Sequence, residues 1–352
     1  MIEVEGEALE RDAHQFLWDL GYLVLPRLTI HATTIVGSKK VVDKTITDLD
    51  AYGIRFGPYL ERDTFLVDCK HRSEGVFSQA LQALGVASLF GVKNLLVVRS
   101  SVDVPTQRFS ELFGVRLVQV SEFRRRVKPR QAGSFSEDAH RLVRSLEDTC
   151  NGFQKAISYR ASNAVVDPDP YRRLKSLRML YQEVKRDLAR TFSNSSSQLL
   201  MYRLFQYSQL ALAEIAAESI HLSRYHYDRF LLSKTVGDMD FKMRAFERIA
   251  RATNPDMEVS LEAVDLAPSY LDMLRNLVDE MRENPWIVQE YLRYTDLVIH
   301  QFGLPSIPID MKSVKDEIPY ADRGLFSKWN LNMMQVLDEE KSPPGFMIEL
   351  LG

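Results

Sequence analysis

The sequence has little cysteine and no long apolar run. Cys69 and Cys150 are its two cysteines among 352 residues, too few for the disulfide framework of small secreted domains. No apolar stretch is long enough to span a bilayer. The first residues lack the order of charged, apolar and small residues that marks a signal peptide. We therefore expect a cytoplasmic protein that does not enter a membrane.

The short motifs of several enzyme classes are also missing. No glycine-rich loop of the G-x-x-x-x-G-K type is present, which argues against ATP hydrolysis by this chain. His221 and His226 are five residues apart. A metal-binding pair on one helix face needs a spacing of three or four, so we interpret both histidines as structural.

The net charge is close to neutral, at −3, but it is unevenly placed. Residues 1–235 carry 33 Lys and Arg against 27 Asp and Glu, whereas residues 236–352 carry 12 against 21. A polyanion would prefer the first two-thirds of the chain, and the acidic last third would face solvent or a basic partner.

The first 123 residues predict an α/β domain. Apolar residues at helical spacing over residues 6–22 predict a helix that ends at Gly21. Apolar and β-branched runs predict strands, and two further stretches have helical spacing. The order α-β-β-β-α-β-α-β predicts a mixed sheet flanked by helices. The expected strands are residues 23–30, 42–54, 63–70, 93–100 and 115–120, and the later helices are residues 75–91 and 105–114.

The remainder predicts an all-α C-terminal domain over residues 136–352. A basic stretch with Pro129 and Gly133, residues 124–135, is interpreted as a linker. Residues 195–232 have the pattern of one long helix. Long amphipathic helices need a partner face, so we expect this domain to serve in oligomerisation, substrate selection or partner docking, with a homodimer as one outcome.

Acidic and basic residues end two of the expected strands. Asp48 and Asp50 close the strand that leads into "AYG", and Asp68, Cys69 and Lys70 close the strand "LVDCK". The strand period of two places Asp68 and Lys70 on one face, and likewise Asp48 and Asp50. Magnesium prefers oxygen ligands, usually one or two carboxylates with water and phosphate.

These pieces, an N-terminal helix with a glutamate, an aspartate strand and a D-x-K strand, resemble the PD-(D/E)xK nuclease superfamily. The resemblance covers about residues 5–122 and implies a restriction-endonuclease-like fold. It implies a Mg²⁺-dependent endonuclease, with Mn²⁺ as a substitute, that hydrolyses phosphodiester bonds of nucleic acid, foremost DNA. A role in restriction or antiviral defence is implied by the resemblance alone.

The resemblance also implies roles for single residues. Asp50 and Asp68 would bind the metal, the backbone carbonyl of Cys69 could be a third ligand, and Lys70 would hold the attacking water or steady the phosphate charge. Asp48 is the alternative to Asp50, and Thr47 stands where the family has proline. Glu10 matches a supporting helix glutamate, or is a solvated helix residue. Gln79 and Gln82 are candidates for further support.

The chain's basic residues leave two interpretations open. The basic run after residue 123 either contacts a nucleic-acid backbone or forms a solvated linker. Its residues are Arg124, Arg125, Arg126, Lys128 and Arg130. Lys39, Lys40 and Arg55 are expected in loops near the strand ends, where they could follow a phosphate backbone.

Two alternatives to a nuclease follow. The chain could be a catalytically inactive nuclease-fold subunit that binds nucleic acid or scaffolds a larger complex, or an interaction protein whose helical part docks to a motor ATPase. For Asp68 and Lys70 the alternative is a surface salt bridge, worth roughly 0–1 kcal/mol.

Overall fold

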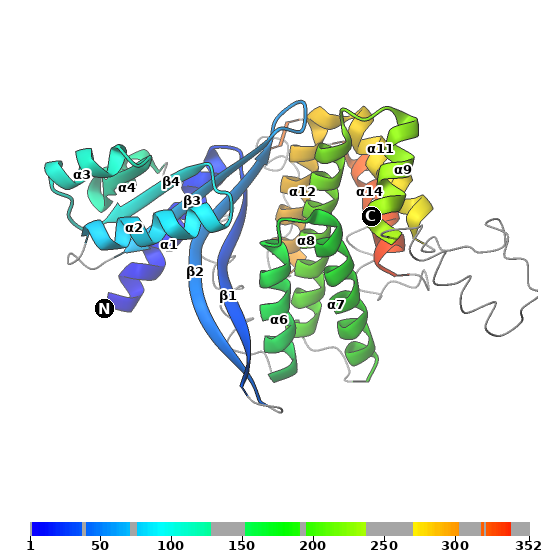
Figure 1. The fold of residues 1–352 in the computed structure, drawn as a ribbon, viewed down its shortest axis with the longest axis horizontal. Helices are drawn as coiled ribbons and strands as arrows, with labels where there is room; N and C mark the ends of the chain where they lie inside the picture. The colour runs from blue at the N-terminus through cyan, green and yellow to red at the C-terminus, as the bar shows by residue number, and fades with distance from the viewer. Residues whose placement is uncertain are drawn as a thin grey trace, which may run out of the picture.

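The structure is a computed structural model that describes residues 2–36, 40–70, 76–127, 152–190, 195–236, 270–302, 318–319 and 322–338. Its N-terminal part has the predicted order of elements, with a mixed sheet flanked by helices (Figure 1). The strands are β1 (Leu23–Val36), β2 (Lys40–Phe56), β3 (Arg62–Lys70), β4 (Asn94–Arg99) and β5 (Val115–Gln119), and the helices are α1 (Ile2–Asp19), α2 (Val76–Leu89), α3 (Val104–Glu111) and α4 (Val120–Arg126).

The five strands lie side by side in chain order. The first three strands are antiparallel to one another, whereas β3, β4 and β5 are parallel. Parallel neighbours need a crossover connection, and α2 and α3 supply the two crossovers. The strand that carries Asp68 and Lys70 is therefore central, and each of its edges is paired to a strand.

Helix α1 packs on one face of the sheet through residues at helical spacing. Leu9, Ala13 and Leu17 are fully buried and join a cluster with Val67 and Val98 of the sheet. The helix ends before Gly21, whose φ of +86° is a left-handed conformation that glycine adopts without steric cost. Burial of this stripe fixes α1 over the C-terminal half of β3.

The second part of the described chain is helical. It contains a short 3₁₀ turn, η2 (Pro285–Ile287), between two of its helices. In the described residues no helix combines the length and apolar composition needed to cross a membrane. The helices are α6 (Gly152–Val165), α7 (Pro170–Arg190), α8 (Ser195–Ser219), α9 (Arg224–Val236), α11 (Leu271–Glu283), α12 (Val288–Phe302) and α14 (Arg323–Leu337).

The prediction of one long helix over residues 195–232 is wrong. The chain breaks into α8 and α9, because the Leu222 amide donates to the Ser219 carbonyl at 2.9 Å and closes a turn. Ser223 then accepts from the His226 amide at 3.5 Å and begins the next helix. Serine favours such helix starts since its hydroxyl satisfies a free backbone N–H.

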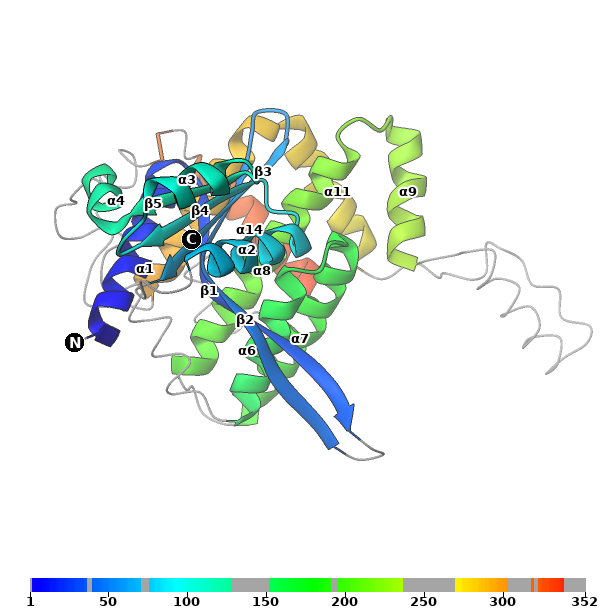
Figure 2. The same cartoon turned by 60° about the vertical axis from the view of Figure 1, so that its left-hand side comes forward.

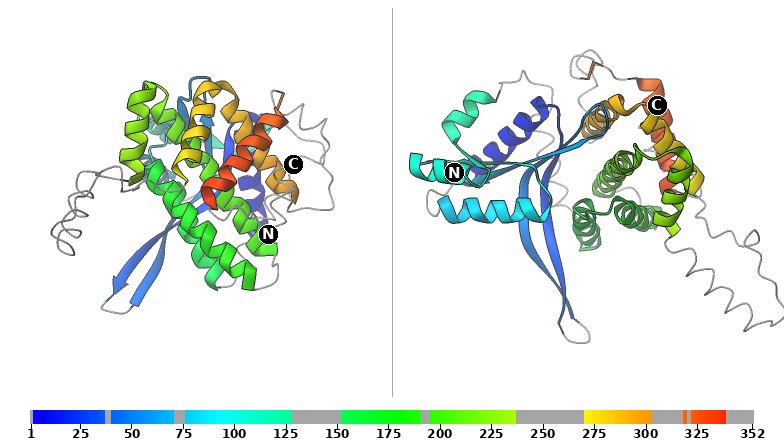
Figure 3. Two further views of the ribbon diagram at one scale, coloured as in Figure 1. Left: turned by 90° about the vertical axis from the view of Figure 1, so that its right-hand side faces the viewer. Right: turned by 45° about the horizontal axis from the view of Figure 1, so that its top comes forward.

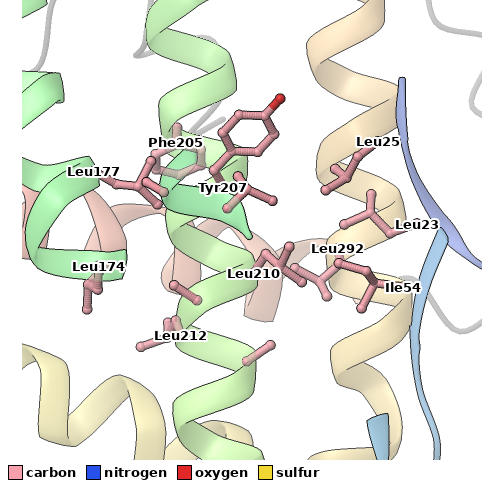
Figure 4. Packing of buried hydrophobic residues seen from close by; sticks show 14 of the residues in the cluster. Leu23, Leu25, Ile54, Leu174, Leu177, Phe205, Tyr207, Leu210, Leu212 and Leu292 are labelled. Atoms are coloured by element: carbon pink, nitrogen blue, oxygen red, sulfur yellow. The ribbon is translucent and has the colours of Figure 1, made fainter. Parts of the chain in front are cut away.

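The sheet and the helical bundle share one apolar core. Leu23, Leu25 and Ile54 of the first two strands meet Leu210 of α8 and Leu292 of α12 (Figure 4). Figures 1 and 3 show the bundle lying against β1 and β2. The predicted boundary at residues 124–135 stays a prediction, since residues 128–135 lie outside the described ones.

Polar contacts also hold α12 to the N-terminal part. The Gln289 side chain accepts from the Phe56 amide at 2.9 Å and donates to the Gly21 carbonyl at 2.7 Å. Arg293 lies over the Trp18 ring, with 4.2 Å between its guanidinium carbon and the ring centre. These contacts fix α12 against the end of α1 and the end of β2.

Candidate active site

The site begins where β2 leaves β3. Their ladder runs from the pair Phe56 and Arg62 to the pair Ala51 and Val67, whereas β2 continues beside β1 as far as Lys40. Asp50 is the first residue beyond this fork. Its Oδ2 accepts the Cys69 backbone N–H at 2.7 Å. A carboxylate thus takes the place of the backbone acceptor that a continuing strand would have supplied.

Asp68 and Lys70 meet Asp50 at the fork. Lys70 Nζ lies 2.9 Å from Asp68 Oδ1 and 3.6 Å from Asp50 Oδ2. Both carboxylates are buried, with 7% of Asp50 and 9% of Asp68 exposed, whereas the lysine is partly open to solvent. The structure therefore brings together the three residues that the sequence put at the centre of its hypothesis.

Burial and charge perturb these groups in opposite directions. Burial raises the pKa of Asp50 to about 7, and the charges of Asp68 and Glu10 act the same way, against Lys70 and the Cys69 amide. For Lys70, burial opposes the charged form, but Asp50 and Asp68 outweigh it and hold the lysine pKa above its usual value. Lys70 is consequently a fixed cation at neutral pH, and Asp50 is the group that titrates.

Cys69 contributes its backbone to this site and turns its side chain away. Its Sγ points to the Leu9 carbonyl of α1, 3.8 Å away. Burial, and then the neighbouring carboxylates Asp50 and Asp68, raise the pKa of the thiol well above its usual value. The sulfur is therefore kept as a thiol, and the backbone carbonyl stays the predicted ligand.

Glu10 of α1 is close enough to Asp50 and Cys69 for its charge to shift their pKa values. Its charge raises the pKa of Asp50 and of Cys69, and its Oε2 is buried. The alternative of a solvated helix residue does not fit a buried carboxylate oxygen. Glu10 thus belongs to the electrostatic surroundings of Asp50.

Three further candidates are not joined to this cluster by any contact within the described residues. Asp48 pairs with Thr29 in the ladder to β1, and its Oδ1 is buried without a hydrogen bond there. Gln79 also has a buried oxygen, Oε1, without a hydrogen bond in the described part. Gln82 is exposed on α2. Their supporting roles stay predictions.

The basic stretch begins as a helix. Arg124, Arg125 and Arg126 form the last turn of α4, whereas Lys128 and Arg130 lie outside the described residues. Arg124 pairs with Asp12 at 2.9 Å and Arg126 with Glu122 at 2.5 Å. Two of these arginines therefore already have carboxylate partners, which favours a structural role for them.

Arg99 is a site neighbour that the sequence reasoning missed. It ends β4 opposite Lys70 in the parallel register, and it is fully buried. Burial lowers the pKa of Arg99, and the charge of Asp68 opposes that shift. A charged residue that directly follows the apolar run "LLVV" in the strand "NLLVVR" was the signal available in the sequence.

The chain was compared with family models, curated proteins and solved structures. None of them matches it. In the described residues no group of three or more His, Cys, Asp or Glu side chains gathers in an arrangement that could hold a metal ion. The case for a function therefore rests on the geometry of Asp50, Asp68 and Lys70.

The raised pKa of Asp50 predicts a pH-dependent stability in metal-free protein. Because the folded-state pKa is about 7 against an ordinary 3.8, the contribution of Asp50 to stability is complete below about pH 4 and is lost as pH rises to about 7. Asp50→Asn removes this titration. We expect the melting temperature of wild type, relative to Asp50→Asn, to fall across that window and then level off. Melting curves in EDTA test this; parallel profiles of the two proteins would contradict it.

Proposed function

We propose that this protein is a Mg²⁺-dependent nuclease that hydrolyses phosphodiester bonds of DNA. The observation that carries the proposal is an excess of buried carboxylates at the fork between β2 and β3. Asp50 and Asp68 share one lysine there, and the charge of Glu10 acts on Asp50. Arg99 adds one cation beside Asp68. Buried carboxylates are costly unless cations compensate them, so the excess favours a cation site.

The side chains present fit a hard divalent cation. Asp68 Oδ2 is buried and has no hydrogen bond among the described residues. The carboxylate of Asp50 lies near that of Asp68, since Lys70 Nζ contacts both side chains. Two carboxylates with water and phosphate are a usual Mg²⁺ donor set. Asp50, Asp68 and the Cys69 carbonyl would therefore hold the ion.

Lys70 would take the positioning role. Its ammonium is held charged by two carboxylates, so it donates hydrogen bonds and does not act as a base. It can hold the attacking water or stabilise negative charge on a phosphate oxygen. A bound Mg²⁺ would offset the phosphate charge and lower the pKa of its water. Asp50 must lose its proton before it can serve as a ligand.

The fold class supports the proposal without deciding it. A mixed sheet with an N-terminal helix over the D-x-K strand is the arrangement that the resemblance to the PD-(D/E)xK superfamily implies. Membership of that superfamily, the restriction-endonuclease-like fold and a defence role are parts of the proposal. A homodimer and a motor ATPase partner also stay predictions.

A cleavage assay tests the proposal. Purified protein is incubated with supercoiled plasmid, linear duplex, single-stranded DNA and RNA, in Mg²⁺, in Mn²⁺ and in EDTA. We expect cutting of DNA that needs the metal and stops in EDTA. Cutting that continues in EDTA, or no cutting of any substrate, would overturn the proposal.

The inactive nuclease-fold subunit is the second candidate, and one observation favours it. Lys70 contacts both carboxylates, so part of the local charge is already compensated within the chain. Such a subunit would bind DNA equally well with and without metal, and neither Asp68→Asn nor Lys70→Ala would change a cleavage signal, because there would be none.

A further inference from the structure

The ammonium group of Lys70 lies against both carboxylates of the fork. Its Nζ is 2.9 Å from Asp68 Oδ1 and 3.6 Å from Asp50 Oδ2. The proposed function places a divalent ion against these same two carboxylates, completed by water and phosphate. One ammonium group and one metal ion would therefore compensate the same pair of negative charges.

The ammonium can leave this position, whereas the carboxylates are held in it. Of the Lys70 side chain 39% is exposed, against 9% of the Asp50 side chain and 12% of the Asp68 side chain. Asp50 also accepts the Cys69 backbone N–H at 2.7 Å. A lysine carries its charge on a flexible four-carbon stem. The cation of the fork therefore has a path to solvent that the buried carboxylates do not have.

Lys70 ends β3 beyond the last residue that pairs with β2. Strand β3 lies between β2 and β4, with β5 beyond β4 (Figure 2). The ladder of β3 with β2 ends at Val67, whereas its ladder with β4 continues to the pair of Lys70 and Arg99. The backbone of Lys70 is therefore held from the β4 side, and its side chain can move without breaking either ladder.

The charges around the fork determine how a second cation is received. Lys70 contacts Asp50 and Asp68. The charge of Glu10 acts on Asp50, and Arg99 adds a cation beside Asp68. With the three carboxylates ionised against these two cations, the described groups carry one net negative charge. A divalent ion added to them would leave a net positive charge, whereas one that displaces the ammonium would leave none. Charge therefore favours exchange of the ammonium for the metal over binding of both together.

We propose that Lys70 is a built-in counter-ion, whose ammonium occupies the cation position at Asp50 and Asp68 in metal-free protein and leaves it when a divalent ion binds. This inference rests on the proposed function and adds the regulation of its metal site. The lysine compensates two buried carboxylates while no metal is bound, which an apolar side chain could not do. The displaced ammonium stays tethered beside the site, where it can act as the hydrogen-bond donor described above.

A counter-ion has two consequences that a lysine with a positioning role alone does not have. Its removal strengthens metal binding while cleavage falls, because the competing charge is gone. The metal in turn releases the ammonium, since the coupling between two groups that compete for one site is reciprocal. Lys70 should therefore become more reactive when a metal ion binds.

The experiment compares two variants of Lys70 with a matched control. Lys70→Met removes the charge and keeps an unbranched side chain. Lys70→Arg keeps a cation that is charged at every working pH. The control is Lys175→Met, which removes the charge of an exposed lysine on α7.

Metal affinity is measured with Mn²⁺ alone, at fixed pH and without DNA, by following the free ion with electron paramagnetic resonance. We expect Lys70→Met to bind Mn²⁺ about tenfold more tightly than wild type or better, because a unit charge a few Å away opposes a partly buried cation strongly. Lys70→Arg should bind no more tightly than wild type, since it keeps the competing charge. The control should behave as wild type.

Displacement of the ammonium is measured on the wild-type protein itself. Acetylation by N-hydroxysuccinimide acetate, followed by mass spectrometry, reports the reactivity of each lysine in Mg²⁺ and in EDTA. We expect Lys70 to react several-fold faster in Mg²⁺, and Lys175 to react at the same rate in both. This measurement needs no variant, so it decides the question even where Lys70→Met fails to fold.

The outcomes separate this inference from the proposed function. Equal Mn²⁺ affinity of wild type and Lys70→Met, or equal labelling of Lys70 with and without Mg²⁺, would overturn the counter-ion while DNA cleavage could still support the nuclease. Tighter binding by Lys70→Met and faster labelling of wild type, without any cutting of DNA, would support the counter-ion and overturn the nuclease. No Mn²⁺ binding by any of the proteins would overturn both.

Discussion

Lys70→Ala is expected to lower metal-dependent DNA cleavage by about 100- to 1,000-fold, the usual loss when one preorganised hydrogen-bond donor to developing negative charge is removed. The lysine contacts both carboxylates and stays charged at neutral pH, so its removal takes away the cation that Asp50 and Asp68 share. Initial rates on supercoiled plasmid, in excess Mg²⁺ and with excess enzyme, measure the loss in the chemical step.

Asp68→Asn should reduce cleavage at least as much, for a different reason. The asparagine keeps the size of the side chain but removes the charge that would hold the metal. Raising the metal concentration should therefore recover part of the activity of Asp68→Asn and none of that of Lys70→Ala. Lys175→Ala, which changes an exposed residue of α7, is the matched control.

Folding must be excluded as the cause of either loss. Removing Lys70 leaves two buried carboxylates without their shared cation, although Asp50 can take up a proton, since its pKa is already about 7. Melting curves in EDTA report whether each variant is folded at the assay temperature. A folded Lys70→Ala protein that cuts at the wild-type rate would contradict the role given to Lys70.

The order of elements in the N-terminal part was predictable from local signals. Apolar spacing indicated α1 and the buried strands, and the glycine at position 21 indicated the end of the helix. The structure has Gly21 at the positive φ that glycine adopts at a helix end. The predicted strands of residues 23–30 and 42–54 are shorter than β1 and β2. Polar residues such as Thr33, Thr34 and Asp43 are not typical of the apolar strands of a sheet interior. They lie where β1 and β2 continue beside each other beyond the last pair of β2 with β3.

The break between α8 and α9 shows a different limit. The apolar pattern continues across Ser219 and Ser223, so periodicity alone could not locate the turn. Serine hydroxyls that bond to the backbone, as Ser219 does to the Ala216 carbonyl at 3.1 Å, end a helix locally without interrupting its pattern.

The composition of the site was predictable, and its geometry was not. The sequence left Asp48 and Asp50 as alternatives, since both share a strand face. In the structure Asp50 contacts the Cys69 N–H and Lys70, because β3 separates from β2 immediately after Ala51. The metal-binding role of either aspartate stays a prediction. Arg99 was missed since its neighbour in space, Lys70, is distant in sequence. Arg55 was expected in a loop but lies in β2, paired with Asp63 at 2.9 Å.

Glu214→Gln is expected to lower the free energy of unfolding by about 3–5 kcal/mol, the usual cost of breaking a buried ion pair. Glu214 of α8 lies 2.9 Å from Arg173 of α7 and 3.4 Å from Arg62 of β3. Arg173 and Glu214 are almost fully buried, with 1% and 5% exposed. The glutamine keeps the shape but leaves the charge of both guanidinium groups uncompensated.

Urea unfolding at fixed pH measures this loss. The matched control is Glu183→Gln, which breaks an exposed pair with Arg160 and should cost at most about 1 kcal/mol. Equal small losses in the two variants would show that Glu214 is not the buried counter-ion described above.

Glu214 also connects the helical bundle to the sheet, through Arg62. Arg62 begins the strand that ends in Asp68 and Lys70, and its guanidinium also donates to the Tyr52 hydroxyl of β2 at 3.0 Å. Glu214 thus joins the helical bundle to both strands that form the fork. Hydrogen exchange should show faster opening of β2 and β3 in Glu214→Gln than in Glu183→Gln, because the bundle would no longer hold the strands through a buried charge. Unchanged protection of both strands would mean that the apolar core around Leu23, Ile54 and Leu210 is sufficient to hold the sheet on the bundle.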